Sequence, residues 1–332
     1  MREHRFIITA KTSGQALAKV LMTRLRISRG AVLRAIRQRQ VNLDGKPCTD
    51  PHRRIHTGSR VVVLQFPRPQ PRDTRIAPII RFADRDLLVV EKPAGLTTMR
   101  HASEAAEFGR RGKRFLPKTL AELLLELMAR GRQLGRARLF AVHRVDKDTS
   151  GLVVFARTRE AERHLGQQFR AHSVERRYLA LVRGTAQSRR IDSWLVRDRG
   201  DGRRGSCRQE GAGKRAITHI SVLERLGDYS LVECRLETGR THQVRIHLGE
   251  AGIPICGERV YDRPLHGRPT LPDGSGLTRV ALHASVLGFN HPRTGQRLSW
   301  KSPLPRDMSA ALNRMRLHVR ISECDEKSND KD

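Results

Sequence analysis

The segment at residues 141–156 reads Ala141-Val142-His143-Arg144-Val145-Asp146-Lys147-Asp148-Thr149-Ser150-Gly151-Leu152-Val153-Val154-Phe155-Ala156. Residues 148–151 are typical turn formers, and the apolar run 152–156 has the length and composition of a buried strand. A polar turn at the end of a strand can hold a carboxylate in a cleft, which makes Asp146 a candidate functional residue. The same residues also fit an ordinary turn with a surface ion pair between Arg144 and Asp146, so the segment alone leaves its function open.

Composition narrows the class of partner. The 332 residues include 65 Lys and Arg against 34 Asp and Glu, a formal net charge of +31. Such an excess favours a polyanion as partner, and nucleic acid is the first expectation. The 38% of hydrophobic residues can build a packed core, and no apolar run approaches the roughly 20 residues that cross a bilayer. We therefore expect a protein without a membrane span, divided into one large and one small domain.

Cysteine usage indicates a reducing compartment. The five cysteines are widely scattered and include no Cys-x-x-Cys pair, which argues against a disulfide framework and a cysteine-built zinc site. The apolar stretch near the N-terminus is too short for a secretory signal. These observations predict a cytoplasmic protein with reduced thiols.

The first 60 residues are strongly basic, with 14 Lys and Arg against three acidic residues. The spacing of apolar residues predicts a helix over 17–25 and a second helix that starts at Ser28 and buries Leu33 and Ile36. Asp-Gly within residues 41–46 predicts a tight hairpin, and residues 60–64 read as a strand. Basic side chains gather on the second helix, namely Arg29, Arg34 and Arg37.

This order of elements resembles the small RNA-binding domain named after ribosomal protein S-four, over residues 12–66. The chain departs from that family at Gln15-Ala16-Leu17, where an Arg-Leu-Asp-like run is usual. The resemblance implies an α/β domain in which Arg29, Arg34 and Arg37 contact RNA. A basic helical domain that binds acidic partners by charge alone is the alternative.

The rest of the chain divides by composition. Alternating prolines predict a semi-rigid linker over 67–78, followed by a large domain over 79–320. Stretches rich in glycine, proline and charge predict inserted loops at 101–118, 197–215 and 263–278, whose roles the sequence leaves open. Residues 321–332 are acidic and are expected to be a disordered tail.

Further motifs follow in order along the large domain. Residues 91–96 read Glu-Lys-Pro-Ala-Gly-Leu, residues 177–184 Arg-Tyr-Leu-Ala-Leu-Val-Arg-Gly, residues 238–247 Thr-Gly-Arg-Thr-His-Gln-Val-Arg-Ile-His, and residues 300–305 Trp-Lys-Ser-Pro-Leu-Pro. With residues 143–151 they resemble the RluA-like family of RNA pseudouridine synthases, over nearly all of 79–305. Val145 replaces the family's leucine, which is a conservative apolar change.

The resemblance implies an α+β fold whose large domain is built on a mixed, largely antiparallel sheet. It also implies isomerisation of uridine within a structured RNA, in which the glycosidic bond breaks, the uracil turns, and a ring carbon rejoins the sugar. No atom is gained or lost, so no nucleotide, nicotinamide or metal cofactor is expected. A Walker A loop ending at Lys214 would need glycine at position 208 and serine or threonine at position 215, and both positions are arginine. His242 and His247 are five residues apart, which disfavours a zinc site on one helix face.

The same resemblance implies catalytic roles for three residues. Asp146 would act as nucleophile or as acid/base, because a carboxylate can attack an anomeric carbon or take a proton. Arg245 would be its ion-pair partner and favour the ionised carboxylate. Tyr178, on an extended run over 174–182, would line the base pocket and stack on uracil. Core packing of Tyr178 and a part in proton transfer both stay open.

Other residues are expected to contact the RNA. A base inside a stacked helix is out of reach, so we expect it to be flipped out, with Arg144 entering near the vacated place. Arg240 suits a phosphate or carboxylate contact. His242 shares a face with Arg245 on a helix expected to begin near Thr241 and to end at Gly252.

The resemblance favours ribosomal large-subunit RNA over transfer RNA as the partner. A non-catalytic RNA-binding or ribosome-assembly factor that keeps the fold is the main alternative. A hydrolase would need a paired carboxylate, and Asp148 is the only one close in sequence. Neither the identity of the uridine nor the oligomeric state follows from the sequence.

Overall fold

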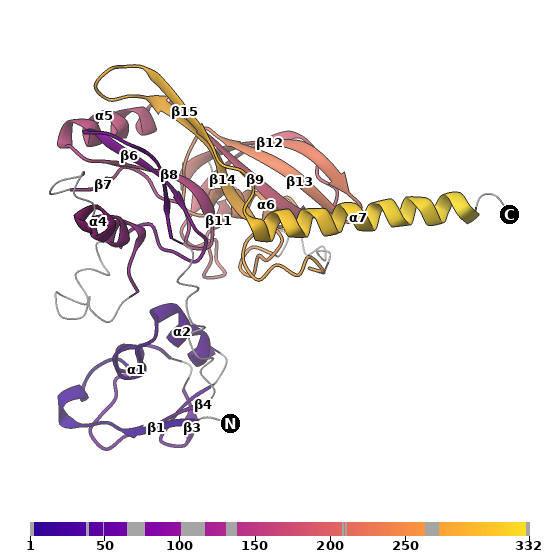
Figure 1. Ribbon diagram of the computed structural model, residues 1–332. Coiled ribbons are helices and arrows are strands. Elements are labelled where there is room, and N and C mark those ends of the chain that lie inside the picture. The colour runs from indigo at the N-terminus through magenta and orange to yellow at the C-terminus, as the bar shows by residue number, and fades with distance from the viewer. Residues whose placement is uncertain are drawn as a thin grey trace. The chain divides into compact units, whose positions relative to one another are not determined.

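The computed structural model describes residues 3–37, 40–48, 50–64, 77–100, 117–130, 138–207, 209, 211–262 and 272–329. The described residues fall into two compact units, one within 1–76 and 100–118 and the other within 77–99 and 119–332 (Figure 1). Most of the predicted linker 67–78 and of the predicted loop 101–118 lies outside the described residues. No described helix has the length and apolar composition that a bilayer span requires.

The first unit packs two helices against a four-stranded sheet. The sheet has the order β1-β4-β2-β3. Its elements are β1 (Glu3–Ile7), α1 (Leu17–Leu25), α2 (Arg29–Arg37), β2 (Val41–Leu43), β3 (Lys46–Pro47) and β4 (Arg60–Leu64), with a 3-10 turn at Ala10–Thr12. Asp44 and Gly45 have φ of 51° and 81°, as a tight hairpin turn between β2 and β3 requires. Both predicted helices, the hairpin and the strand at 60–64 are confirmed.

Two features of this unit differ from what the sequence predicted. Strand β1 was not predicted; it pairs with β4 along all of its residues, so the sheet begins at residue 3, before the stretch 12–66 that carries the resemblance. In α2 the side chains of Val32, Ala35 and Ile36 are buried, whereas Leu33 is half-buried. The helix starts at Arg29, after Ser28 accepts a hydrogen bond from the backbone N–H of Ala31, and the spacing i, i+3, i+4 from Val32 then faces the sheet.

The second unit is built on an eleven-stranded sheet. Its main path runs β11-β10-β12-β13-β9-β14-β8-β6-β5, with β15 paired to β14 and β7 to β8. Only the β14–β8 pair is parallel among the described strands, so the sheet is mixed and mostly antiparallel, as predicted. The strands are β5 (Ile79–Ala83), β6 (Leu87–Lys92), β7 (Phe140–Ala141), β8 (Ser150–Ala156), β9 (Glu175–Arg183), β10 (Arg189–Val196), β11 (Gly205–Cys207), β12 (Lys214–Leu226), β13 (Tyr229–Leu236), β14 (Leu282–Asn290) and β15 (Arg297–Lys301).

Helices cover both faces of this sheet. Successive residues of its central strands point to opposite faces, and apolar residues occupy both sets of positions. Leu88 and Val90 of β6 join a core with α4 (Leu120–Arg130), α6 (Gln243–Glu250) and α7 (Arg306–Asn329). Leu87 and Val89 join a second core with α5 (Arg159–Arg170). Strand β8 is buried along its whole length, which agrees with the continuous apolar run at 152–156.

Two predicted irregular segments contain regular structure. Helix α7 runs to Asn329, through most of the segment predicted as a disordered acidic tail. Residues 306–329 contain no glycine or proline. Once the buried first turns of the helix have formed, each further residue adds a hydrogen bond at little cost in free energy. The predicted loop 197–215 contains β11, which extends the sheet edge beside β10. Of the predicted loop 263–278, residues 263–271 lie outside the described residues.

Candidate active site

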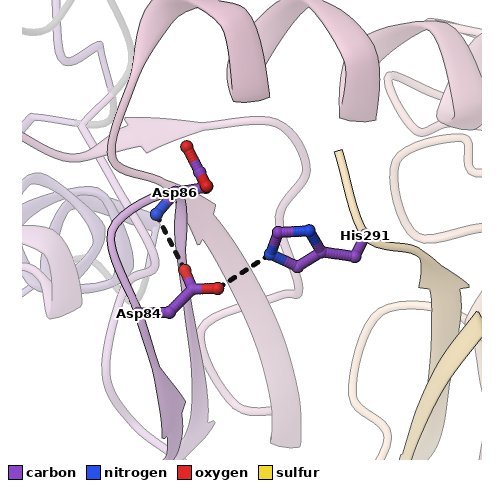
Figure 2. Close-up of side chains that lie close together, drawn as sticks. All are labelled: Asp84, Asp86 and His291. Carbon is purple, nitrogen blue, oxygen red and sulfur yellow. Dashed lines mark hydrogen bonds and ion pairs between the residues drawn. The ribbon is translucent and has the colours of Figure 1, made fainter. Parts of the chain in front are cut away.

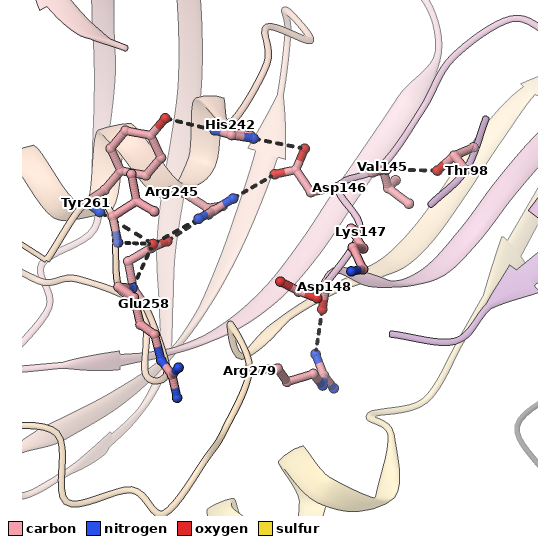
Figure 3. A network of polar contacts seen from close by, with 12 residues as sticks. Thr98, Val145, Asp146, Lys147, Asp148, His242, Arg245, Glu258, Tyr261 and Arg279 are labelled. Carbon is pink, nitrogen blue, oxygen red and sulfur yellow. Dashed lines mark hydrogen bonds and ion pairs between the residues drawn. The ribbon is translucent and has the colours of Figure 1, made fainter. Parts of the chain in front are cut away.

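The loop at 143–151 is held in place by side chains from three other segments. Buried Lys92, in the first of the ordered motifs, donates hydrogen bonds to the carbonyls of Pro93, Leu96 and Lys147 at 2.9, 2.8 and 3.0 Å. Thr98 donates to the carbonyl of Val145 at 2.8 Å. Arg279 donates to the carbonyl of Asp148 at 3.2 Å (Figure 3). Burial lowers the pKa of Lys92 to about 7. The loop is therefore preorganised by the fold.

Gly151 closes the loop at the parallel contact between β8 and β14. Its φ is 109°, and a Cβ at this position would lie 2.2 Å from the carbonyl oxygen of Ala284. Only glycine combines this backbone conformation with so close an approach. The glycine of the Thr-Ser-Gly motif thus sets how the loop leaves the sheet.

A pocket of about 500 Å³ opens beside this loop and brings together six of the predicted site residues. Asp146 comes from the loop, Tyr178 from β9, and Arg245 from α6. The residues that line the pocket are Val142, His143, Arg144, Val145, Asp146, Thr149, Gly166, Phe169, Arg170, His172, Arg176, Tyr178, Leu236, Gly239, Arg240, His242, Gln243, Val244, Arg245 and Leu282.

Asp146 faces two basic side chains without being tightly bound by either. Its Oδ2 lies 3.5 Å from Nη1 of Arg245, and its Oδ1 lies 3.8 Å from Nε2 of His242 (Figure 3). The Asp146 side chain is 19% exposed. The predicted pairing with Arg245 is therefore present, but it is a long contact that leaves both carboxylate oxygens able to accept further bonds.

Arg245 has a closer partner that sequence reasoning missed. Its Nε and Nη2 donate to Glu258 at 2.7 and 2.9 Å, and the Glu258 side chain is fully buried. Burial would raise the pKa of Glu258, but its hydrogen bonds and charge interaction with Arg245 outweigh burial and lower it. The Glu258 carboxylate also accepts backbone N–H groups from residues 259–261. The only signal for Glu258 in the sequence is an acidic residue that follows the run 253–256 after one glycine.

His242 precedes α6 and is held by a second unpredicted residue, Tyr261. The helix begins at Gln243, and His242 itself has a left-handed φ of 59°. Nδ1 of His242 lies 2.8 Å from the hydroxyl of Tyr261. Burial lowers the pKa of His242, against the opposing charge of Asp146, and burial raises the pKa of Tyr261 to about 12. A neutral imidazole and a neutral phenol therefore stand behind one side of Asp146.

The other predicted residues occupy different environments. Tyr178 is 9% exposed, and burial raises the pKa of its hydroxyl. Arg144 is exposed at the pocket and has no ion-pair partner within the described part of the chain. Arg240 lines the pocket and donates through Nε to the carbonyl of Arg215 at 3.0 Å. Arg29 is exposed on the first unit, while the side chains of Arg34 and Arg37 lie outside the described residues.

One cluster away from the pocket has the residue types of a metal site. Ligand atoms of Asp84, Asp86 and His291 lie within 4.8 Å of one another (Figure 2). Asp84 already accepts the backbone N–H groups of Asp86 and Leu87 at 2.7 and 2.8 Å and contacts Nε2 of His291 at 2.7 Å. Arg293 donates to both oxygens of Asp86. The cluster is thus an internally satisfied structural contact between two turns.

The chain is similar to known proteins over much of its length. The family model described as RNA pseudouridylate synthase matches residues 86–250. The ribosomal large subunit pseudouridine synthase D of Zymomonas mobilis is 39% identical over 254 residues, which cover 74% of this chain and 76% of the relative. The synthase D of Nitrosomonas europaea is 38% identical over 309 residues, 91% of this chain and 83% of the relative.

A solved structure shows the same fold. The human protein RNA Pseudouridylate Synthase Domain Containing 4 superposes with a TM-score of 0.56 at 25% identity, over 72% of this chain and 93% of that one. The matched sequence contains the loop with Asp146, strand β9 with Tyr178 and helix α6 with Arg245, the three elements that build the pocket. The chain therefore belongs to the RNA pseudouridylate synthase family and is an enzyme that isomerises uridine to pseudouridine.

Proposed function

We propose that this enzyme modifies a uridine of large-subunit ribosomal RNA and that Asp146 is its nucleophile. The observation that carries the proposal is the position of the Asp146 carboxylate in the pocket, 3.5 Å from Arg245 and 3.8 Å from His242. The ribosomal substrate is supported by the names of the relatives from Zymomonas mobilis and Nitrosomonas europaea.

The chemistry needs a carboxylate with a free oxygen. The N1–C1′ bond of uridine breaks, a C5–C1′ bond forms, the C5 proton leaves and N1 gains one, so atoms and electrons balance without a co-reactant. Asp146 attacks the electron-poor C1′, and the positive charge of Arg245 lies 3.5 Å from the carboxylate. The long contacts of Asp146 support this role, because a carboxylate already bound by short hydrogen bonds would be a poorer nucleophile.

Tyr178 and Arg144 are proposed to hold the flipped nucleotide. The target base leaves its stack at a cost of a few kcal/mol and enters the pocket, where the ring of Tyr178 offers a stacking surface. Arg144 is exposed beside Asp146 and can enter the RNA where the base was. Arg240 and His242 supply polar contacts at the same pocket.

The first unit is proposed to be an RNA-binding domain of the S-four type over residues 12–66, extended by β1. Its sheet and helix pair, with exposed Arg29 at the start of α2, support phosphate binding. Replacing Arg29, Arg34 and Arg37 together by alanine should weaken RNA binding and lower the salt slope by about 2 to 3. An unchanged slope would contradict the role of this unit.

The substrate proposal is tested by incubating purified enzyme with protein-free large-subunit ribosomal RNA and, separately, with transfer RNA, and then mapping pseudouridines. We expect new pseudouridine at one or a few positions of the ribosomal RNA. Modification of transfer RNA alone would contradict the proposal that the substrate is ribosomal RNA. Binding of either RNA without any modification would favour an assembly factor.

A further inference from the structure

Arg176 is a buried cation in the pocket with no acidic partner. Its side chain lies on the same strand as Tyr178, two residues before it, and residues two apart on a strand point to the same face. Arg176 is 7% exposed and lines the pocket. No described carboxylate forms an ion pair with it. An isolated charge taken out of water costs several kcal/mol, so an uncompensated guanidinium at this position needs an explanation.

The contacts that Arg176 does make leave its charge unneutralised. Nη2 donates to the backbone carbonyl of Glu237 at 2.7 Å, and the guanidinium lies 5.6 Å from the centre of the Phe169 ring. Nε is buried and has no hydrogen-bond partner in the described structure. A Cβ on Gly239 would lie 2.5 Å from Nη1, so the absence of a side chain there leaves room for the guanidinium.

The neighbouring Arg177 shows that the fold can neutralise an arginine on this strand. Arg177 points to the opposite face, where its Nε donates to Glu175 at 2.9 Å and its Nη1 donates to Glu233 at 3.2 Å. In the pocket the guanidinium of Arg240, rather than an acid, lies near that of Arg176; burial, and then the repulsion from Arg240, lowers the pKa of Arg176. Two guanidinium groups without an acid favour an anionic ligand.

We propose that Arg176 binds a phosphodiester oxygen of the RNA next to the target uridine, so that the charge of Arg176 is compensated only when substrate is bound. This inference rests on the proposed function of the pocket. Two residues of strand separate Arg176 from Tyr178 by about 7 Å, which lets one nucleotide contact both side chains. A phosphate fits better than a uracil carbonyl, because only the phosphate carries a full negative charge.

The first test measures binding of a large-subunit ribosomal RNA transcript between about 50 and 200 mM KCl. Arg176→Met should weaken binding about tenfold and flatten the salt slope by about 0.7 to 0.9. Arg176→Lys should keep the slope. Arg177→Met is the matched control and should change neither value. Equal slopes for Arg176→Met and the unsubstituted protein would overturn the proposal. This readout does not require turnover, so a protein that binds in this way but forms no pseudouridine would refute the proposed function alone.

Thermal unfolding without RNA distinguishes a ligand-binding role from a structural one. If Arg176 serves the ligand, Arg176→Met removes an uncompensated buried charge, and its Tm should equal or exceed that of the unsubstituted protein. A clearly lower Tm together with unchanged RNA binding would show that the residue only supports the fold.

The second test locates the phosphate. An RNA oligonucleotide that carries the mapped uridine is made with one neutral methylphosphonate on its 5′ or its 3′ side. At one of these positions the substitution should weaken binding about tenfold for the unsubstituted protein and have no further effect on Arg176→Met. The same loss in both proteins at both positions would contradict a contact between Arg176 and a flanking phosphate.

Discussion

Two clusters of the second unit each combine two carboxylates with a histidine and an arginine, but they differ in how completely their charges are paired. The turn cluster, Asp84, Asp86, His291 and Arg293, joins the β5–β6 turn to the β14–β15 turn through contacts of 2.6 to 2.7 Å. Figure 2 shows the first three of these residues. In the pocket cluster, Asp146, His242, Arg245 and Glu258, the two contacts of Asp146 are 3.5 and 3.8 Å (Figure 3). The tight pairs of the turn cluster leave no oxygen for a substrate, whereas Asp146 keeps that capacity.

The difference lies in where each arginine directs its strongest bonds. Arg293 directs two short hydrogen bonds at Asp86, so that carboxylate is fully occupied. Arg245 directs its two short bonds at buried Glu258 and presents only Nη1 to Asp146. Because Glu258 accepts the two short hydrogen bonds, Arg245 places its positive charge near Asp146 without binding the Asp146 oxygens tightly.

The largest effect is expected for Asp146→Asn. The amide keeps the shape of the side chain but cannot act as a nucleophile, so pseudouridine formation should fall by about a thousandfold or more. RNA affinity should stay within a few-fold, because the phosphate contacts remain. Asp84→Asn in the turn cluster is the control and should retain activity. Rapid turnover by purified Asp146→Asn in a single-turnover assay would remove the proposed role.

Glu258→Gln should have the next largest effect. The substitution keeps a hydrogen-bond acceptor but removes the buried negative charge, which frees Arg245 to bind Asp146 more tightly. We expect kcat to fall about 10- to 100-fold, with little change in RNA affinity, and the free energy of unfolding to fall by about 3 kcal/mol. Full activity of Glu258→Gln in steady-state assays would show that the reaction does not require Arg245 to direct its short hydrogen bonds at Glu258.

Tyr261→Phe should reduce kcat/KM by a smaller factor, about threefold to tenfold, because one hydrogen bond to Nδ1 of His242 is lost while the ring contacts remain. In a His242→Ala background the same substitution should have almost no effect. Tyr229→Phe, at a tyrosine that does not line the pocket, is the control. Equal losses in both backgrounds would mean that Tyr261 does not act through His242.

Asp86→Asn should leave activity unchanged and alter stability alone. The side-chain hydrogen bonds from Arg293 are the main cause that lowers the pKa of Asp86. A carboxyl whose pKa is lower in the folded state stabilises the protein above its unfolded pKa, and that stabilisation is lost as pH falls through the folded value. The free energy of unfolding should fall by about 1 to 2 kcal/mol at neutral pH, and this difference should shrink below about pH 4. A difference that persists at lower pH in chemical denaturation would exclude the charge as its cause.

Much of the fold could be predicted because its signals are local. The continuous apolar run at 152–156 indicated a strand buried on both faces, and Asp44-Gly45 indicated the hairpin of the first unit. Strand β1 escaped prediction because an edge strand of five residues acquires its conformation from pairing with β4, 50 or more residues away. Helix α7 was underestimated because acidic composition says little about a helix that buried residues have already nucleated.

The site could be predicted only where motifs carried it. Asp146 and Arg245 are 99 residues apart, and the family resemblance placed them together, as the pocket confirms. Glu258 and Tyr261 have no local pattern that marks them, because their roles depend on a turn that comes close to α6. The lack of an acidic partner for Arg176 is a property of its surroundings in space, which no linear pattern reports.

The most direct test of the central claim is complementation in cells that lack the gene, with the modified uridine mapped in large-subunit ribosomal RNA. We expect the modification to disappear with the gene, to return with the unsubstituted protein and with Asp84→Asn, and to stay absent with Asp146→Asn expressed at the same level. Return of the modification with Asp146→Asn, or its loss with Asp84→Asn in folded protein, would contradict the account.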